Sequence, residues 1–337
     1  MKNQNINSIF KALKFIVLIF LVFGCQKSNE NNNQIKYGLF KKNIIANGVS
    51  RCYAIYIPNN IKKTTAVPLV FELHGGGVYI EDMTGESGHK TPYKLWMNLA
   101  ENEKFIVVYP EGLNGAYNKP SWNDCREDCI INSSADDVDF IKTLIDEISK
   151  NYNIDQNRIY VSGTSNGGFM ALRLAVELSD KIAAVASVAA AMPAVSKCSQ
   201  PNNRISVLFM NGTNDNNMPF NGGIIGNPPN SDHGSVFSTK NSVKFWVNFN
   251  KTDTIPVKFT FPDIDTSDGG IVTKYTYKNG EQETEVVFYK IYGGGHSAPS
   301  IKEQYSHLFE QYFNKQNHDI EMTTEVWKFF KNKLLHK

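Results

Sequence analysis

The stretch NRIYVSGTSNGGFMAL, residues 157–172, decides the fold. Its first six residues have the composition of a short buried strand, and residues 168–175 have that of a helix. Between them, a Gly-x-Ser-x-Gly pattern places Ser165 between two glycines, Gly163 and Gly167. This arrangement is typical of a nucleophile elbow, a strained turn that lifts a serine hydroxyl off the sheet. Glycine suits positions 163 and 167 because a side chain at either would crowd the turn and the helix.

Strands and helices alternate on both sides of this turn. Apolar runs predict strands at 50–57, 68–73, 105–110, 182–188, 205–210 and 286–292. Helical spacing predicts helices at 95–103, 136–148, 240–249 and 323–335. At the start of the second helix, Asp136 and Asp137 are expected to serve as caps and dipole partners rather than as paired catalytic acids. The alternation predicts one α/β domain over residues 35–337, with a mostly parallel sheet and helices on both faces.

Four chemically suitable positions each follow a predicted strand: residues 74–77, Ser165, Asp215 and His296. In a parallel sheet these positions meet beyond the carboxyl ends of the strands, where ligands bind. A serine hydroxyl becomes a good nucleophile when a base takes its proton. We predict that His296 is this base and that Asp215 orients it. The order Ser, Asp, His along the chain is that of the α/β-hydrolase fold.

An oxyanion formed at this serine also needs hydrogen-bond donors. The N–H of Asn166, directly after the nucleophile, is one candidate, and the loop at Gly75 and Gly76 is expected to supply another. His74 is the best rival to His296, but we expect it to brace this loop at the edge of the substrate pocket. Trp122 either lines the acyl pocket or is simply packed in the interior.

The N-terminal residues are expected to direct export. Residues 1–24 combine a basic start with an apolar run, 15–23, that is too short to span a bilayer. Cys25 follows Gly24, as in a bacterial lipoprotein signal, where the cysteine is acylated after cleavage; the alternative is an ordinary signal peptide. Residues 25–34 predict a polar tether. We therefore expect a membrane-anchored protein, periplasmic or at the cell surface, or otherwise a secreted one.

The remaining cysteines, Cys52, Cys125, Cys129 and Cys198, suggest disulfides in an exported chain. Three pairings are open, and the preferred one joins Cys125 to Cys129 and Cys52 to Cys198. Cys-x3-Cys could also suggest zinc, but no histidine stands near it at ligand spacing, so no metal site is expected. A formal net charge of +2 with scattered lysines gives no indication of a nucleic-acid partner.

Taken together, these motifs resemble the secreted polyhydroxybutyrate depolymerase and feruloyl esterase group of α/β-hydrolases. The matching stretches cover most of the chain after the tether: 51–56, 73–75, 107–112, 121–123, 136–140, 159–168, 212–215, 219–220, 292–296, 319–320 and 326–330, with Pro299. The resemblance implies an α/β-hydrolase fold, the triad Ser165, Asp215 and His296, and no cofactor.

The resemblance also implies the activity. We expect a serine carboxylic-ester hydrolase acting on feruloyl or acetyl esters of plant polysaccharide. The alternatives are depolymerase action on a hydroxyalkanoate polyester, peptidase action, and a non-catalytic sugar-binding surface protein. The presence of all three triad residues argues against the last, because a pure binder has no need of them.

The chain departs from the family pattern at the rim of the expected pocket. Ala298 stands before Pro299, where the family usually carries tryptophan. Residues 77–92 and 221–235 are interpreted as rim insertions, and residues 301–318 add a further segment after the base. These segments are expected to shape the acyl and alcohol pockets.

Overall fold

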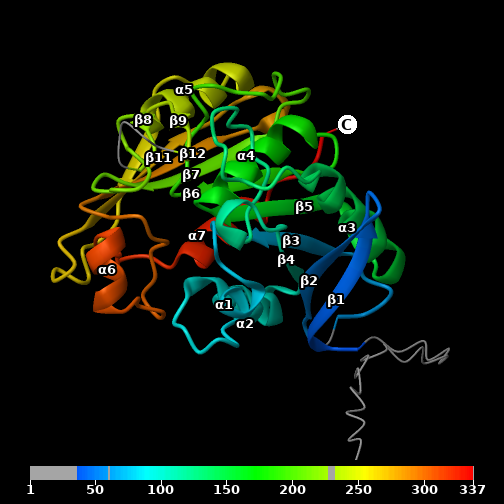
Figure 1. Cartoon of the computed structure of the whole chain (residues 1–337). Helices are drawn as coiled ribbons and strands as arrows, with labels where there is room; N and C mark the ends of the chain where they lie inside the picture. The colour runs from blue at the N-terminus through cyan, green and yellow to red at the C-terminus, as the bar shows by residue number, and fades with distance from the viewer. Residues whose placement is uncertain (1–35, 60, 227–231, 337) are drawn as a thin grey trace, which may run out of the picture. The chain divides into compact units, whose positions relative to one another are not determined.

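A central sheet of ten strands organises the computed structural model, which describes residues 36–59, 61–226 and 232–336 (Figure 1). The strands run in the order β1-β2-β4-β3-β5-β6-β7-β12-β11-β10. From β4 to β12 neighbouring strands are parallel, and the strands at both ends are antiparallel. Their bounds are β1 Gly38–Ala46, β2 Val49–Ile57, β3 Val67–Leu73, β4 Ile106–Pro110, β5 Ile154–Thr164, β6 Ala184–Val188, β7 Ser206–Gly212, β10 Val257–Thr260, β11 Ile271–Tyr277 and β12 Val286–Tyr292. A separate two-stranded sheet joins β8 Gly223–Ile224 to β9 Ser235–Val236.

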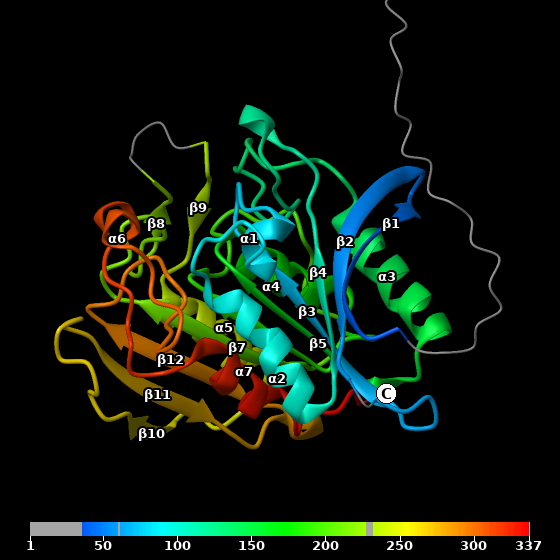
Figure 2. The ribbon, with the colours of Figure 1, turned by 90° about the horizontal axis from the view of Figure 1, so that it is seen from below.

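Helices cover both faces of the sheet (Figure 2). On one face α2, Leu95–Glu103, packs against α7, Met322–Phe330. On the other lie α3, Asp137–Asn151, α4, Asn166–Glu177, and α5, Thr239–Asn250. Two short helices, α1, Ile80–Thr84, and α6, His307–Phe313, belong to the connections beyond the strands. The predicted α/β architecture is therefore observed.

The predicted elements are present, and the differences concern the end of one helix, the edge strands of the sheet and short elements such as β8 and β9. The closing helix ends at Phe330, although the pattern predicted it to continue to residue 335. Strands β1, β10 and β11 and helices α1 and α6 were not predicted. All four residues of β10 are exposed. Val257 and Phe259 do alternate with Lys258 and Thr260, but four residues are too few for the pattern to stand out in the sequence.

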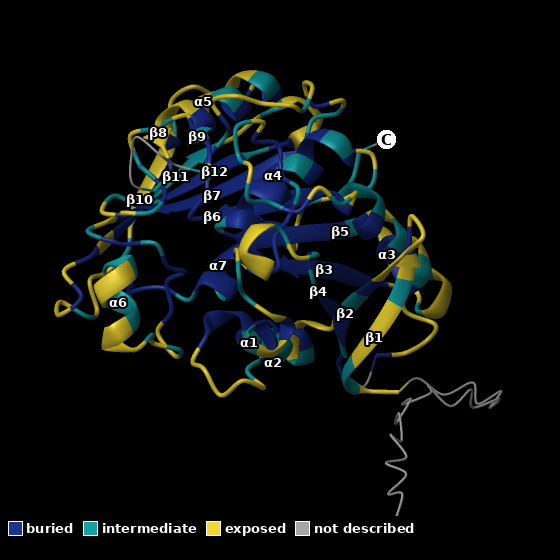
Figure 3. Ribbon diagram, in the orientation of Figure 1, coloured by how far each residue is buried: buried dark blue, intermediate teal, exposed yellow. Residues whose placement is uncertain are grey.

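The core lies on the central strands, of which β3, β4, β6 and β7 are buried along their whole length (Figure 3). Aromatic rings join the sheet to α2 and α7. Trp327 stacks on Phe105 with ring centroids 4.2 Å apart, and Phe330 stacks on Tyr160 at 4.9 Å. Trp96 of α2 lies parallel to Phe330 at 6.5 Å. Fully buried aromatic side chains contribute large apolar areas, so these rings fix α2 and α7 against the sheet.

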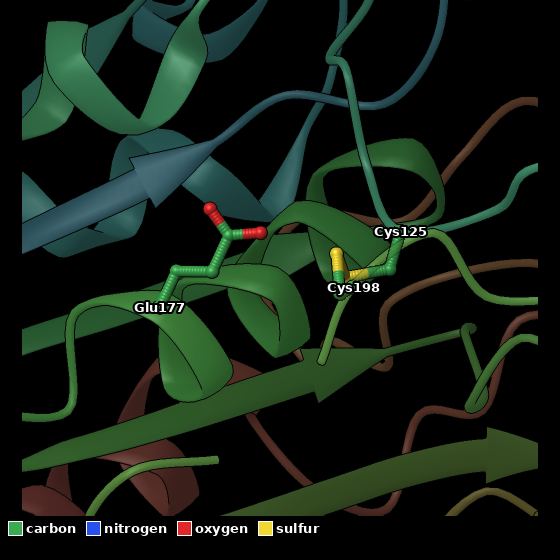
Figure 4. Close-up of side chains that lie close together, drawn as sticks. All are labelled: Cys125, Glu177 and Cys198. Atoms are coloured by element: carbon green, nitrogen blue, oxygen red, sulfur yellow. A yellow bond between two sulfur atoms is a disulfide. The ribbon is translucent and has the colours of Figure 1, made fainter. Parts of the chain in front are cut away.

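The predicted disulfide pairing is wrong. Cys125 is bonded to Cys198, while Cys52 and Cys129 are free (Figure 4). The N–H of Lys197 donates to the carbonyl of Cys125 at 3.0 Å, so the two loops already run side by side at this point. Cys52 instead lies within β2, paired with β1. The path of two long loops decides the partner of Cys125, and cysteine spacing contains no information about that path.

The predicted signal segment, the tether and Cys25 lie outside the described residues. From Lys36 onward the chain forms one compact unit. Within the part of the chain that the structure describes, no helix combines the length and the apolar character that a membrane crossing requires.

Candidate active site

Ser165 occupies a strained turn between β5 and α4. Its φ of 55° and ψ of −120° lie outside the regions that residues with a side chain usually adopt. The turn is held by its backbone: the N–H of Ser165 donates to the carbonyl of Val188 at 2.8 Å. A Cβ added at Gly163 would lie 2.4 Å from the carbonyl oxygen of Gly167, and one added at Gly167 would lie 2.2 Å from that of Leu73. Both glycines are therefore required by close backbone approach.

The structure brings the three predicted triad residues together. The Ser165 hydroxyl lies 2.9 Å from Nε2 of His296, and Nδ1 of His296 lies 2.7 Å from Oδ2 of Asp215. The other carboxylate oxygen of Asp215 accepts the N–H groups of Asn217 at 2.9 Å and Met218 at 2.7 Å. These backbone donors fix the orientation of the carboxylate, so it holds the imidazole with Nε2 toward the serine.

Close contact between two loops places the acid beside the base. Asp215 follows β7 and His296 follows β12, two neighbouring parallel strands. The N–H of Asn214 donates to the carbonyl of Gly294 at 2.9 Å. A Cβ added at Gly212 would lie 2.2 Å from that same carbonyl oxygen. The distance between the two loops is thus set by backbone atoms.

The candidate oxyanion donors border the serine. A Cβ added at Gly75 would lie 3.6 Å from Cβ of Ser165, and one added at Gly76 would lie 3.8 Å from Cβ of Asn166. In the described part of the chain, the N–H groups of Gly75 and Gly76 take no part in any hydrogen bond found. Asn166 is the first residue of α4, and a helix N-terminus carries unpaired N–H groups and partial positive charge. The arrangement can therefore stabilise a negative oxygen bound near Ser165.

His74 does not line the substrate cavity, contrary to one of the predictions for it, but it does brace the glycine loop. The N–H of Gly112 donates to Nε2 of His74 at 2.9 Å, so Nδ1 carries the proton and donates to the carbonyl of Gly75 at 2.7 Å. Burial lowers the pKa of His74 to about 4. The ring therefore stays neutral, and its two hydrogen bonds fix the loop behind the cavity.

Trp122 is also buried and away from the cavity lining, so the packed alternative is the correct one. Its indole N–H donates to the carbonyl of His74 at 2.9 Å, and the two rings lie 4.7 Å apart. Its backbone N–H donates to Oδ1 of Asn166 at 2.6 Å. Trp122 thus joins the two segments that carry the candidate oxyanion donors.

A buried ion pair that the sequence did not reveal anchors Asn166 from the other side. The amide of Asn166 donates to Oδ2 of Asp124 at 2.8 Å. Arg126 binds both oxygens of the same carboxylate, at 2.6 and 3.0 Å, and its guanidinium carbon lies 3.9 Å from the ring centre of Phe169. Charged residues in a loop usually face solvent, so no signal in the sequence distinguished these.

Asp136 and Asp137 are structural, as predicted, although their roles differ. Asp136 caps α3 by accepting the N–H of Asp139 at 3.0 Å. Asp137 is buried and bonded to Arg51 at 2.6 Å, and its other oxygen accepts the N–H of Asn123 at 2.7 Å. It therefore anchors the segment that leads to Trp122.

Ser165 and His296 open into a cavity of about 1170 Å³. All three rim segments singled out in the sequence contribute to its wall. Their contributions are Val78 and His89 from 77–92, Ile225 and His233 from 221–235, and Tyr305, Phe309 and Phe313 from 301–318. The last three are aromatic residues at a spacing of four, a helical signal that was visible in the sequence.

Two groups of potential metal ligands occur among the described residues, and neither includes a triad residue. Cys125, Glu177 and Cys198 have ligand atoms within 4.8 Å of one another, but both sulfurs belong to the disulfide (Figure 4). In the second group, Asp265 binds Nδ1 of His318 at 2.7 Å, and Asp268 accepts backbone N–H groups. Both groups are accounted for by bonds within the protein.

The chain is similar to known esterases. The Phospholipase/Carboxylesterase family model matches residues 85–226. Feruloyl esterase D of Neurospora crassa is 28% identical over 173 residues, which are 50% of this chain and 54% of that protein. The chain is similar to the feruloyl esterase group of α/β-hydrolases.

Two further relatives match the chain over different lengths. Feruloyl esterase B of Piromyces equi is 29% identical over 253 residues, 72% of this chain and 42% of that protein. The bifunctional acetylxylan esterase/xylanase XynS20E of Neocallimastix patriciarum is 29% identical over 173 residues, 51% of this chain and 22% of its own length. The chain thus spans between 22% and 54% of these three curated relatives.

Among solved structures, the acetyl xylan esterase from Aspergillus awamori superposes with a TM-score of 0.50 at 16% identity. The match covers 78% of this chain and 95% of that one. At this level of identity the likeness concerns the fold, and it confirms the predicted α/β-hydrolase architecture.

Proposed function

We propose that this protein is an exported serine carboxylic-ester hydrolase that forms an acyl-enzyme at Ser165 and acts on feruloyl or acetyl esters of plant polysaccharide. One observation carries the proposal: the unbroken chain of contacts from Ser165 through His296 to Asp215, at 2.9 and 2.7 Å. The names of the relatives, feruloyl and acetylxylan esterases, support carboxylic-ester hydrolysis and this choice of acyl groups.

Acylation follows from the positions of these atoms. Oγ of Ser165 attacks the ester carbonyl carbon, and its proton passes to Nε2 of His296. Asp215 stabilises the imidazolium that forms. The carbonyl oxygen, now negative, lies against the N–H of Asn166 and those of the Gly75–Gly76 loop. When the C–O bond to the alcohol breaks, His296 returns its proton to the leaving oxygen.

Deacylation uses the same groups with water in place of serine. His296 removes a proton from the water, which attacks the acyl carbon, and the second oxyanion occupies the same site. The bond to Ser165 then breaks, the serine oxygen regains a proton from His296, and the acid leaves. Each turnover consumes one water molecule and returns Ser165 and His296 to their starting protonation states.

The serine mechanism is tested first by labelling and mutation. A fluorophosphonate probe should label the wild-type protein at Ser165 and leave Ser165→Ala unlabelled. Hydrolysis of 4-nitrophenyl acetate by Ser165→Ala should fall on the order of a million-fold, as loss of a triad serine does in other enzymes. Residual activity near that of the wild type would exclude Ser165 as the nucleophile.

The substrate is tested by a panel of esters. Methyl ferulate, acetylated xylan and a polyhydroxyalkanoate emulsion should be offered to the same preparation. We expect turnover of the first or second. Turnover of the polyester alone would replace this choice of substrate with depolymerase action while leaving the serine mechanism in place.

Export and anchoring form a separate part of the proposal. They are supported by the sequence before Cys25 and by the Cys125–Cys198 disulfide, because disulfides persist mainly in oxidising compartments. Expression of the full chain with an alkyne-tagged fatty acid should label the wild type and not Cys25→Ser. Equal labelling of both proteins would rule out an anchor at Cys25.

A further inference from the structure

Three aromatic rings of the 301–318 segment form a row along the cavity wall. The rings of Tyr305 and Phe309 stack with centroids 4.0 Å apart, and Phe309 and Phe313 follow at 4.5 Å. The ring of Phe313 lies 6.1 Å from that of His296. All three line the cavity, and each is only partly buried. We call these three residues the aromatic ladder; they are spaced four apart on and just before α6.

The ladder is fixed to the backbone of the candidate base. The N–H of His296 donates to the carbonyl of Phe313 at 2.7 Å, and the N–H of Gly295 donates to the carbonyl of Lys315 at 2.7 Å. At its other end, the Tyr305 hydroxyl donates to that of Tyr93 at 3.4 Å. The rings therefore keep one position relative to the reacting atoms.

The ladder leads to the closed part of the cavity. Tyr93 and Thr164 also line it, both are buried, and Thr164 directly precedes Ser165. The opposite end of the cavity is open to solvent, because Tyr117, which also lines it, is 75% exposed. An alcohol that belongs to a polymer must continue out of the cavity, whereas an acyl group ends within it. The buried wall next to Ser165 therefore suits the acyl group.

We infer that the aromatic ladder binds the ring of an aromatic acyl group and makes the protein select aryl-acyl esters over acetyl esters. This inference rests on the proposed ester hydrolysis at Ser165. Phe309 is stacked between the rings of Tyr305 and Phe313, so a planar acyl ring would meet the cavity-facing edges of this row in an edge-to-face arrangement, whereas an acetyl group carries no ring to do so. The ladder lies in residues 301–318, the segment interpreted from the sequence as additional to the family pattern.

The test compares three substrates with one variant and two controls. Phe309→Ala removes the central ring, Phe309→Leu retains apolar volume without the ring, and Leu308→Ala truncates a neighbouring residue of α6 that is 63% exposed. The substrates are 4-nitrophenyl ferulate, 4-nitrophenyl acetate and methyl ferulate. The first two share a leaving group, and the first and third share an acyl group.

We expect Phe309→Ala to raise KM for both ferulates about ten-fold and to change KM for 4-nitrophenyl acetate far less. Phe309→Leu should show a smaller rise, and Leu308→Ala none. A urea titration of each variant shows separately that it is folded.

Two results would overturn the inference. If Phe309→Ala had the same KM values for both ferulates as the wild type, the ladder would have no part in binding the acyl group. A rise for 4-nitrophenyl acetate without one for methyl ferulate would place the ring of the leaving group on the ladder instead. Failure of the proposed function is a different result, because the wild type would then hydrolyse none of the three esters.

Discussion

The turn at Ser165 and helix α6 border the same cavity, yet they are held in opposite ways. The turn is fixed by backbone atoms in close contact, and nearly all residues around it are buried. Helix α6 has seven residues, none of them buried. Its segment is attached by hydrogen bonds, among them those of Asn216 to Tyr312 and of Asn314 to Asn214, and by the Lys94–Glu303 ion pair at the surface. The reacting atoms thus depend on backbone packing, while the wall that meets the substrate is made of side chains that can change at little cost.

After loss of Ser165 itself, the largest expected effect is at Asp215, which holds the base beside the buried turn. Asp215→Asn keeps an oxygen for the N–H groups of Asn217 and Met218, but it places an amide against Nδ1 of His296. The imidazole then adopts the wrong tautomer, and we expect kcat for 4-nitrophenyl acetate to fall about 10⁴-fold. Stopped-time hydrolysis assays measure this directly.

The chain offers a matched control for this substitution. Asp265 binds Nδ1 of His318 at the same distance of 2.7 Å, at a site outside the cavity lining. Asp265→Asn should leave kcat unchanged. If the two variants lost activity equally, the Asp215 effect would be one of general stability rather than of imidazole orientation.

Gly167 provides the next test, this time of stability. Gly167→Ala would place a Cβ 2.2 Å from the carbonyl oxygen of Leu73, where rigid backbone cannot yield. We expect a loss of about 3 kcal/mol or more in the free energy of unfolding, measured by urea titration. Gly76→Ala is the comparison, because its Cβ would meet only Asn166 at an ordinary 3.8 Å. Similar midpoints for the two variants would contradict the view that backbone contact fixes the turn.

The sequence predicted the buried side of the site well, for a physical reason. Ser165, Asp215 and His296 each follow an apolar run that can only be a central strand, and parallel strands deliver their ends to one edge. The glycines at 163 and 167 add a local constraint that depends on no distant residue. Each of these patterns lies within a few consecutive residues, so it can be recognised in one sequence without knowledge of distant contacts.

The rim and the loop contacts could not be predicted in this way. The bond from Cys125 to Cys198 and the link from Asp124 to Asn166 depend on where long loops run, which no local period encodes. Tyr305, Phe309 and Phe313 are spaced four apart, but no helix was predicted there, and the sequence could not say that these residues meet the cavity.

A buried carboxyl beside the elbow strand makes stability depend on pH. Glu72 of β3 pairs with Ser162 of β5, and one oxygen of its carboxyl group accepts the indole N–H of Trp96 at 2.7 Å. Burial raises the pKa of Glu72 to about 8, so the folded protein holds its proton at neutral pH. The unfolded chain releases that proton above its ordinary pKa of about 4.3. The contribution of Glu72 to the free energy of unfolding is therefore fully present below its ordinary pKa and is lost as the pH rises toward 8.

Glu72→Gln should remove this dependence, because the neutral amide can still accept from Trp96. The variant and the wild type should be similarly stable near pH 4.5, and the variant should gain on the order of 3 kcal/mol by pH 7. Urea titrations at several pH values measure the difference. A constant difference across this range would mean that Glu72 is ionised in the folded protein.

The smallest expected effect concerns the attachment of the ladder. Lys94 and Glu303 lie 3.0 Å apart with exposed fractions of 33% and 16%, so the pair is screened by salt and contributes about 0.2–1 kcal/mol. Glu303→Gln should leave the global midpoint within error but speed amide hydrogen exchange in α6, with no change in α4. Because local opening follows the weakest attachment, the same acceleration should appear in the wild type at high salt. Equal protection of α6 and α4 in the wild type would show that the rim is held as firmly as the elbow, and the contrast between them would fail.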